Sequence, residues 1–245
     1  MRALLLAAGL GTRLRPITQG IPKCLVAING KPLLGYWFDL LFTGGVERVL
    51  VNTHYLPEVV EAFVARSRWK EQIELVYEPT LLGTGGTILK NESYFRSQGF
   101  LVAHADNLTD FDVQALLRSY ETRPADIAIL MMTFHTDNPT SCGIVVENAD
   151  GVVVQFHEKS VNPPGNLANG AVYIFAPEIL DFLGKLGKPI IDLSTEVIPH
   201  FLGRIKAFRN DGYLRDIGTL ESLKLAEREF PLAQLAKRQR VPIGQ

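Results

Sequence analysis

The chain has 245 residues, 47% of them hydrophobic and 21% charged, and its formal net charge is −1 at pH 7. This composition is ordinary for a globular protein and allows one large α/β domain or two small ones. The near-zero net charge argues against a general nucleic-acid binder, and no apolar run approaches the ~18–20 residues of a membrane-spanning helix.

Strand-like and helix-like segments alternate over the first part of the chain, to about residue 125. We predict strands at 2–7, 48–53, 73–78 and 99–105 and helices at 32–45, 56–67 and 83–91. Regular alternation of this kind indicates βαβ units. The sequence therefore predicts an α/β fold with a Rossmann-like, mostly parallel sheet flanked by helices.

The pattern changes after residue 125. We predict strands at 126–134, 143–148, 151–158, 167–175 and 205–210 and helices at 177–186, 192–201 and 219–230. A glycine in the short "ADG" link predicts a hairpin between the second and third of these strands. Because no linker separates the halves, we predict a single domain over 1–245. It has a lobe over about 1–125, a smaller mixed-sheet lobe over about 126–230 and a C-terminal tail over 231–245.

The two cysteines, Cys24 and Cys142, lie far apart and fit no metal or redox spacing. The apolar start "MRALLLAAG" is short for a secretion signal, and the charged "GTRLRP" follows it at once. A buried parallel strand accounts for this start better, and so few cysteines indicate a reducing compartment. We therefore predict a cytoplasmic protein with no nucleic acid and no membrane among its partners. The oligomeric state stays open, a homo-oligomer included.

A glycine-rich loop, "AAGLGTRLRP", follows the first strand. Gly9 and Gly11 match the start of the dinucleotide pattern G-x-G-x-x-G, but Leu14 stands where its last glycine belongs. The acidic residue expected about 20 positions later is also absent, and the chain has no Walker motif. A tight structural turn is the alternative reading of these glycines.

Positive charge gathers on the same loop, in Arg13, Arg15 and nearby Lys23. Such neighbours repel one another unless an anion lies among them. Glycine-turn amides cradle phosphate oxygens, while arginine adds a bidentate fork and lysine a point charge. The loop therefore predicts a phosphate-binding site.

Two aspartates are candidate ligands for a divalent cation. Asp106 follows the strand predicted at 99–105, at the sheet edge where ligands bind in open α/β folds, and Asp216 precedes the last predicted helix. Mg²⁺ is typically held by one or two carboxylates plus substrate phosphates. Each aspartate taken alone also fits a helix cap or a surface charge.

The motif "LAAGLGTRLRPIT…IPKCLVAINGKPLL" resembles the signature of the sugar-1-phosphate nucleotidyltransferases, which make nucleotide-activated sugars. The resemblance continues in order through "EPTLLGTGGTIL", "HADN", "CGIV", "FHEKS", "NGAVYIF" and "RDIGTLESL", and so covers nearly the whole chain. Within the family the likeness is greatest to mannose-1-phosphate and heptose-1-phosphate guanylyltransferases. It implies transfer of a nucleoside monophosphate from a nucleoside triphosphate, GTP in the first place, to a sugar-1-phosphate.

The resemblance also implies site residues. Arg13 and Lys23 would act in catalysis, and Asp106 and Asp216 would bind Mg²⁺. The nucleotide would contact Ala7, Ala8, Gly9, Gly11, Thr12, Arg13, Glu78, Gly83 and Thr84, and the sugar phosphate would contact Gly143, Glu158, Lys159 and Asn169.

The chain departs from the family pattern at two positions, since Ala105 precedes Asp106 in place of glycine and Ser160 replaces the proline of E-K-P. Many relatives carry a C-terminal β-helix, which we do not expect here. Alternatives left open are a uridylyl- or thymidylyltransferase, a glycosyltransferase, a Rossmann oxidoreductase and a non-catalytic regulatory relative.

Overall fold

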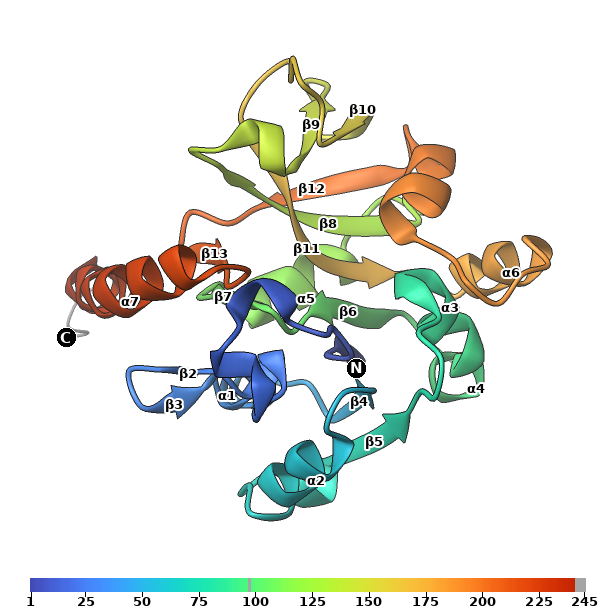
Figure 1. Ribbon diagram of the computed structural model, residues 1–245. Helices are drawn as coiled ribbons and strands as arrows, with labels where there is room; N and C mark the ends of the chain where they lie inside the picture. The colour runs from blue at the N-terminus through green and yellow to red at the C-terminus, as the bar shows by residue number, and fades with distance from the viewer. Residues whose placement is uncertain (97, 241–245) are drawn as a thin grey trace, which may run out of the picture.

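The computed structural model describes residues 1–96 and 98–240, without the side chains of 236–240. A nine-stranded sheet has the order β10-β9-β11-β6-β1-β4-β5, and β8 pairs with β11 and β12 off this path (Figure 1). Its strands are β1 (Arg2–Leu6), β4 (Arg48–Thr53), β5 (Ile73–Tyr77), β6 (Phe100–His104), β8 (Ile129–His135), β9 (Gly143–Glu147), β10 (Val153–Glu158), β11 (Leu167–Phe175) and β12 (Ile205–Arg209).

The helices and the small strands surround this sheet. The helices are α1 (Leu33–Thr43), α2 (Pro57–Ala65), α3 (Gly83–Lys90), α4 (Glu92–Phe95), α5 (Val113–Glu121), α6 (Glu178–Lys185) and α7 (Leu220–Arg240). Two further sheets of two strands each pair β2 (Ala27–Ile28) with β3 (Lys31–Pro32) and β7 (Asn107–Thr109) with β13 (Leu214–Asp216).

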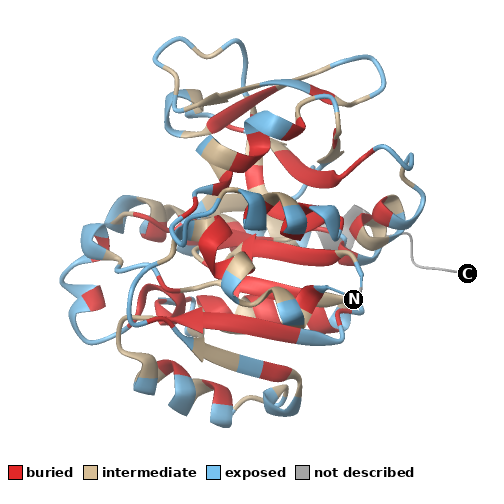
Figure 2. Ribbon diagram, turned by 90° about the vertical axis from the view of Figure 1, so that its right-hand side faces the viewer, coloured by how far each residue is buried: buried red, intermediate tan, exposed pale blue. Residues whose placement is uncertain are grey.

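The strands β6, β1, β4 and β5 run parallel, as predicted. Their residues alternate between two hydrophobic clusters: Ala3 and Leu5 pack with α1, α2 and α5, while Leu4 packs with α3, α4 and α6. Because helices cover both faces, these strands can be apolar along their whole length. Figure 2 shows the buried strands between helices that are exposed on their outer sides. The predicted α/β class with a mostly parallel sheet flanked by helices is confirmed.

The strand β11 connects the two halves of the sheet. It pairs antiparallel with β6 and β9 along one edge and with β8 along the other. The second half is therefore an extension of the same sheet, and no break lies near residue 125. The division into two lobes stays a prediction.

Two predicted helices differ from those observed. The segment 192–201 forms a π-helical turn at Leu193–Val197 and a 3₁₀ turn at Ile198–Phe201, because Pro199 cannot supply a backbone N–H to a regular α-helix. The last helix does not stop at 230: α7 passes through Pro231, which removes only one hydrogen bond, and continues to Arg240. Residues 241–245 of the predicted tail lie outside the described residues. Within the described part of the chain, no helix combines the length and apolarity needed to cross a membrane.

Candidate active site

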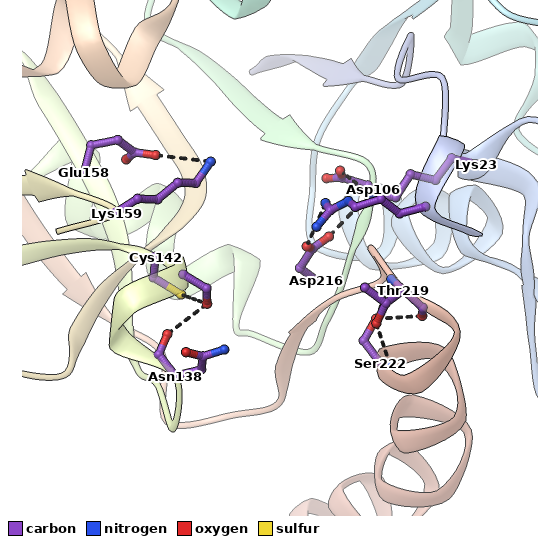
Figure 3. A network of polar contacts seen from close by, with 11 residues as sticks. Lys23, Asp106, Asn138, Cys142, Glu158, Lys159, Asp216, Thr219 and Ser222 are labelled. Carbon is purple, nitrogen blue, oxygen red and sulfur yellow. Dashed lines mark hydrogen bonds and ion pairs between the residues drawn. The ribbon is translucent and has the colours of Figure 1, made fainter. Parts of the chain in front are cut away.

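Three charged side chains from distant parts of the chain meet beyond the end of β6 (Figure 3). The Lys23 ammonium donates a hydrogen bond to Asp106 Oδ2 at 2.6 Å, and its Nζ lies 3.4 Å from Asp216 Oδ1. The Lys23 side chain is only 9% exposed, whereas that of Asp216 is 55% exposed. The two carboxylates compensate a lysine charge that would otherwise be costly to bury.

Backbone pairing places the two aspartates side by side. The strands β7 and β13 are antiparallel, with Asp216 opposite Asn107. In addition, the Ile217 N–H donates to the Asp106 carbonyl at 2.9 Å. A shift of one residue in this register would turn the Asp216 side chain to the other face of the ribbon.

The Lys23 ammonium also determines the charge of Asp106. Burial by itself raises the pKa of this carboxyl, but the nearby positive charge of Lys23, with a smaller contribution from His104, lowers it below its ordinary value. Asp106 is therefore ionised at neutral pH and available to a cation.

The two carboxylates are the type of oxygen ligand that a hard divalent cation prefers, and they already attract the positively charged Lys23 side chain. Among the described residues, no group of three or more His, Cys, Asp and Glu side chains is arranged to hold a metal. A cation held by these two carboxylates would complete its coordination with other oxygen ligands, such as water or phosphate.

A cavity of about 240 Å³ adjoins this cluster. Lys23 and Asp106 line this cavity. Most of the residues predicted to bind nucleotide line it too, namely Ala7, Ala8, Gly9, Glu78, Gly83 and Thr84. Gly11, Thr12 and Arg13 are not among the residues that line it. The binding roles of all these residues stay predictions.

Leu14, which stands where the dinucleotide pattern has its last glycine, anchors the glycine loop. Leu14 is fully buried in a cluster with Ile217 and Leu223, so it ties the loop to the residues before and within α7. Gly11 has φ +62°, and a Cβ there would lie 3.0 Å from the Lys23 Cβ. Glycine therefore suits both the backbone angle and the close approach.

The loop arginines point away from the core. The Arg13 side chain is 70% exposed, and its Nη2 lies 4.0 Å from Asp216 Oδ2. Arg15 is exposed as well. Both arginines are accessible to solvent, and Arg13 lies beside Asp216.

Close packing explains the glycines of the "GTGG" turn at the start of α3. A Cβ on Gly86 would lie 2.1 Å from the Pro189 carbonyl oxygen, and one on Gly83 would lie 2.5 Å from that of Ile191. Thr84 Oγ1 accepts a hydrogen bond from the Leu193 N–H at 2.8 Å. These glycines leave room for residues 189–191. The contact of this turn with a nucleotide base remains a prediction.

The sequence analysis missed Asn52, a polar side chain of the cavity lining. Asn52 Oδ1 accepts the Ala7 N–H at 2.7 Å, and its Nδ2 donates to Thr87 Oγ1 at 3.3 Å. Asn52 thereby fixes the backbone where the glycine loop begins. The signal that could have identified it is a polar residue inside the otherwise apolar strand "RVLVNT".

The residues predicted to hold the sugar phosphate lie on β9, β10 and β11. Glu158 is paired with Gly143 across β10 and β9, and a Cβ on Gly143 would lie 2.7 Å from Glu158 Oε2. Lys159 follows with φ +45°, and its Nζ lies 3.6 Å from Glu158 Oε1. Figure 3 shows Lys159 extending toward the side that carries Asp106 and Asp216. Asn169 is already engaged, since its Nδ2 donates to the Tyr173 hydroxyl at 2.6 Å and its Oδ1 accepts the Ala171 N–H at 3.0 Å.

Comparison with known proteins finds one family model, nucleotidyl transferase, that matches residues 2–231. The mannose-1-phosphate guanylyltransferase of Mycobacterium tuberculosis (strain ATCC 25618 / H37Rv) is 32% identical to the chain, with 89% of this chain and 61% of that protein covered. The chain thus spans about three fifths of that relative's length. The UTP–glucose-1-phosphate uridylyltransferase AglF of Haloferax volcanii is 29% identical, with coverage of 94% and 96%.

A solved structure of similar length gives the same picture. The crystal structure of HddC from Yersinia pseudotuberculosis complexed with GMP-PN superposes with a TM-score of 0.78 at 26% identity, over 94% of this chain and 99% of that one. The family match confirms the resemblance inferred from the sequence motifs.

Proposed function

Because the chain belongs to the nucleotidyl transferase family over residues 2–231, we propose that it transfers a nucleoside monophosphate from a nucleoside triphosphate to a sugar-1-phosphate. In this reaction a phosphate oxygen of the sugar bonds to the α-phosphorus, and the bond from that phosphorus to the β-phosphate breaks. The products are a nucleoside diphosphate sugar and pyrophosphate. The observation that carries the proposal is the Lys23 ammonium between Asp106 and Asp216 beside the cavity.

The obstacle in this reaction is electrostatic, since an anion must approach a polyanion. One like-charge pair at ~4 Å costs on the order of 4 kcal/mol at an effective dielectric near 20. Lys23, held by its two carboxylate partners, would offset charge at the α-phosphate and on the leaving pyrophosphate. The loop amides of Gly9 to Thr12, with exposed Arg13, would hold the remaining phosphates.

Asp106 and Asp216 are the residues that would hold Mg²⁺. The bound ion, shared with phosphate oxygens, would supply charge neutralisation and orient the triphosphate. On the other side of the site, Lys159 would pair with the phosphate of the acceptor, while Glu158, Asn169 and the Gly143 backbone would contact sugar hydroxyls. A phosphate monoester is already ionised near neutral pH, so the protein need not provide a general base.

For the substrates we propose GTP with mannose-1-phosphate or a manno-configured heptose-1-phosphate. The similarity to the mycobacterial guanylyltransferase and to HddC with GMP-PN supports this pair. UTP or dTTP with another hexose-1-phosphate is the second candidate, favoured by the match to AglF over nearly its whole length. The free cysteines Cys24 and Cys142 fit the cytoplasm that this reaction would require for its nucleotide supply.

The direct test is pyrophosphate release with Mg²⁺ across four nucleoside triphosphates and several sugar-1-phosphates. We expect release only when one triphosphate and one sugar-1-phosphate are present together. Protein that binds nucleotide but releases no pyrophosphate across the whole set would instead indicate a regulatory nucleotide-sugar binder.

A further inference from the structure

The strand β13, which carries Asp216, has only three residues. It pairs with β7 and leads into α7 (Figure 1). Successive side chains of a strand point to opposite faces, so Arg215 and Asp216 face opposite ways. Asp216 faces the Lys23 ammonium, whereas Arg215 faces Glu229 of α7. The orientation of Asp216 therefore depends on how the opposite face of this short strand is held.

Glu229 holds that opposite face. Its Oε2 accepts hydrogen bonds from Arg215 Nη2 at 2.9 Å, from Arg215 Nε at 3.2 Å and from the Tyr213 hydroxyl at 3.2 Å. The Arg215 side chain is 22% exposed and that of Glu229 is 35% exposed, so solvent screens this pair less than it screens a fully exposed one. We call Glu229, Arg215 and Tyr213 the α7 clamp.

The α7 clamp is attached to a packed part of the helix. Phe230, the residue after Glu229, is 3% exposed and belongs to the hydrophobic cluster of Leu14. Its ring centroid lies 5.4 Å from that of Tyr213 and 5.4 Å from that of Tyr36. This packing fixes α7 beside β13, and it therefore fixes the carboxylate that Arg215 and Tyr213 reach.

The side-chain contacts of Asp216 itself are long by comparison. Its Oδ1 lies 3.4 Å from the Lys23 ammonium, its Oδ2 lies 4.0 Å from Arg13 Nη2, and the side chain is 55% exposed. The contacts of its neighbour Arg215 are shorter and less exposed. Because the two residues are adjacent on one strand, a rotation of β13 that releases Arg215 also turns Asp216 away from Asp106.

We propose that Glu229 is a positioning residue for the divalent cation. Through Arg215 it holds β13 in the orientation in which Asp216 and Asp106 can share the ion. The inference rests on the proposed function for the role of Asp216 as a cation ligand, and it adds a residue that does not touch the ion. Outer groups that hold a metal ligand in place typically contribute about 10–100-fold to metal affinity.

The test uses Mn²⁺ as the probe and measures its affinity for the complex of the protein with GTP, without sugar phosphate, by counting free Mn²⁺ with EPR. The variants are Glu229→Gln, Asp216→Asn and the two combined. Glu147→Gln is the matched control, because Glu147 of β9 pairs with Arg209 of β12 at 2.8 Å and is 27% exposed. Affinity for GTP in EDTA and the melting temperature are measured alongside.

We expect Glu229→Gln to bind Mn²⁺ about 10-fold more weakly than the wild type, and Asp216→Asn to bind it more weakly still. The combined variant should bind Mn²⁺ no more weakly than Asp216→Asn alone, because the clamp acts only through Asp216. Affinity for GTP in EDTA should be unchanged in Glu229→Gln. Glu147→Gln should change neither affinity.

Three results would overturn the inference. Wild-type Mn²⁺ affinity in Glu229→Gln, whether or not its melting temperature falls, would reduce the clamp to a structural salt bridge. A further loss in the combined variant would show that Glu229 acts on the fold and not through Asp216. Either result would leave the proposed transferase reaction standing. Unchanged Mn²⁺ affinity in Asp216→Asn would remove Asp216 from the cation site, and with it that part of the proposed function as well as this inference.

Discussion

The two sides of the site hold their charged groups in different ways. On the side predicted to bind the nucleotide, Lys23 is 9% exposed and lies between two carboxylates that backbone pairing fixes in place. On the side predicted to bind the sugar phosphate, Lys159 is 69% exposed and has one partner, Glu158, at 3.6 Å. Under the proposed reaction, this difference would place preorganised charge where the phosphate bond is exchanged and adaptable contacts where the acceptor binds.

The largest effects are expected on the rigid side. Lys23→Ala and Asp106→Ala should each lower turnover by about 10²-fold or more, because each removes charge stabilisation that is needed in the transition state. Pyrophosphate release at saturating substrates measures this, and thermal unfolding checks that the variants are folded.

The exposed Lys224 on α7 is the matched control, and Lys224→Ala should turn over normally. Near-normal turnover in either site variant would remove that residue from the mechanism. It would also weaken the contrast between the two sides.

A smaller and more selective effect is expected on the open side. Lys159→Ala should raise the KM for the sugar-1-phosphate about 10–100-fold, the loss typical of one charged hydrogen bond, and leave nucleotide binding unchanged. Initial rates with each substrate varied in turn separate the two constants. Lys185→Ala, on the exposed end of α6, should change neither. An equal loss of affinity for nucleotide would show that the two sides are not independent.

The smallest effect concerns a surface cluster on the outer helix α1. Asp39 accepts hydrogen bonds from Lys31 Nζ at 2.7 Å, Arg68 Nη2 at 2.8 Å and Trp69 Nε1 at 2.9 Å. Partial burial raises the pKa of Asp39, but hydrogen bonds from these three residues outweigh it, so the pKa lies below its ordinary value. A lowered pKa stabilises the fold above the unfolded value of about 3.9, and this stability is lost as pH falls through the folded value.

Below about pH 4, Asp39→Asn should therefore lose less free energy of unfolding than the wild type does. The difference should be less than about 1 kcal/mol, because the side chain is partly exposed. Urea unfolding at pH 7, 4 and 3 measures it, with Asp137→Asn at an exposed position as control. A difference of several kcal/mol in the free energy of unfolding would contradict this prediction. It would show that the Asp39 ion pairs contribute much more to stability than exposed ion pairs usually do.

Local patterns in the sequence were sufficient for most of the strands and for the glycine loop. The run "RALLL" is apolar enough to require cover on both faces, and β1 has that cover. The sequence could not predict that β11 enters the sheet antiparallel beside β6, since the choice depends on contacts between residues about 70 positions apart. The three-residue strand β13 is likewise stabilised by its pairing with β7 rather than by local propensity.

The site was predictable where chemistry is concentrated in one motif, as with Lys23. It was not predictable where a single side chain acts through the backbone of another segment, as Asn52 does on Ala7. Glu78 was identified from the resemblance, but its lack of partners appears only once neighbouring segments enclose it.

The pairing of β7 with β13 has a consequence for the order in which the protein is made. A ribosome delivers the whole parallel half of the sheet long before it delivers Asp216, and the α7 residues that pack around Leu14 follow later still. A nascent chain that ends before β13 therefore presents its glycine loop and Lys23 with only one of the two carboxylates. The charged cluster around Lys23 is therefore completed only after most strands of the large sheet have been made.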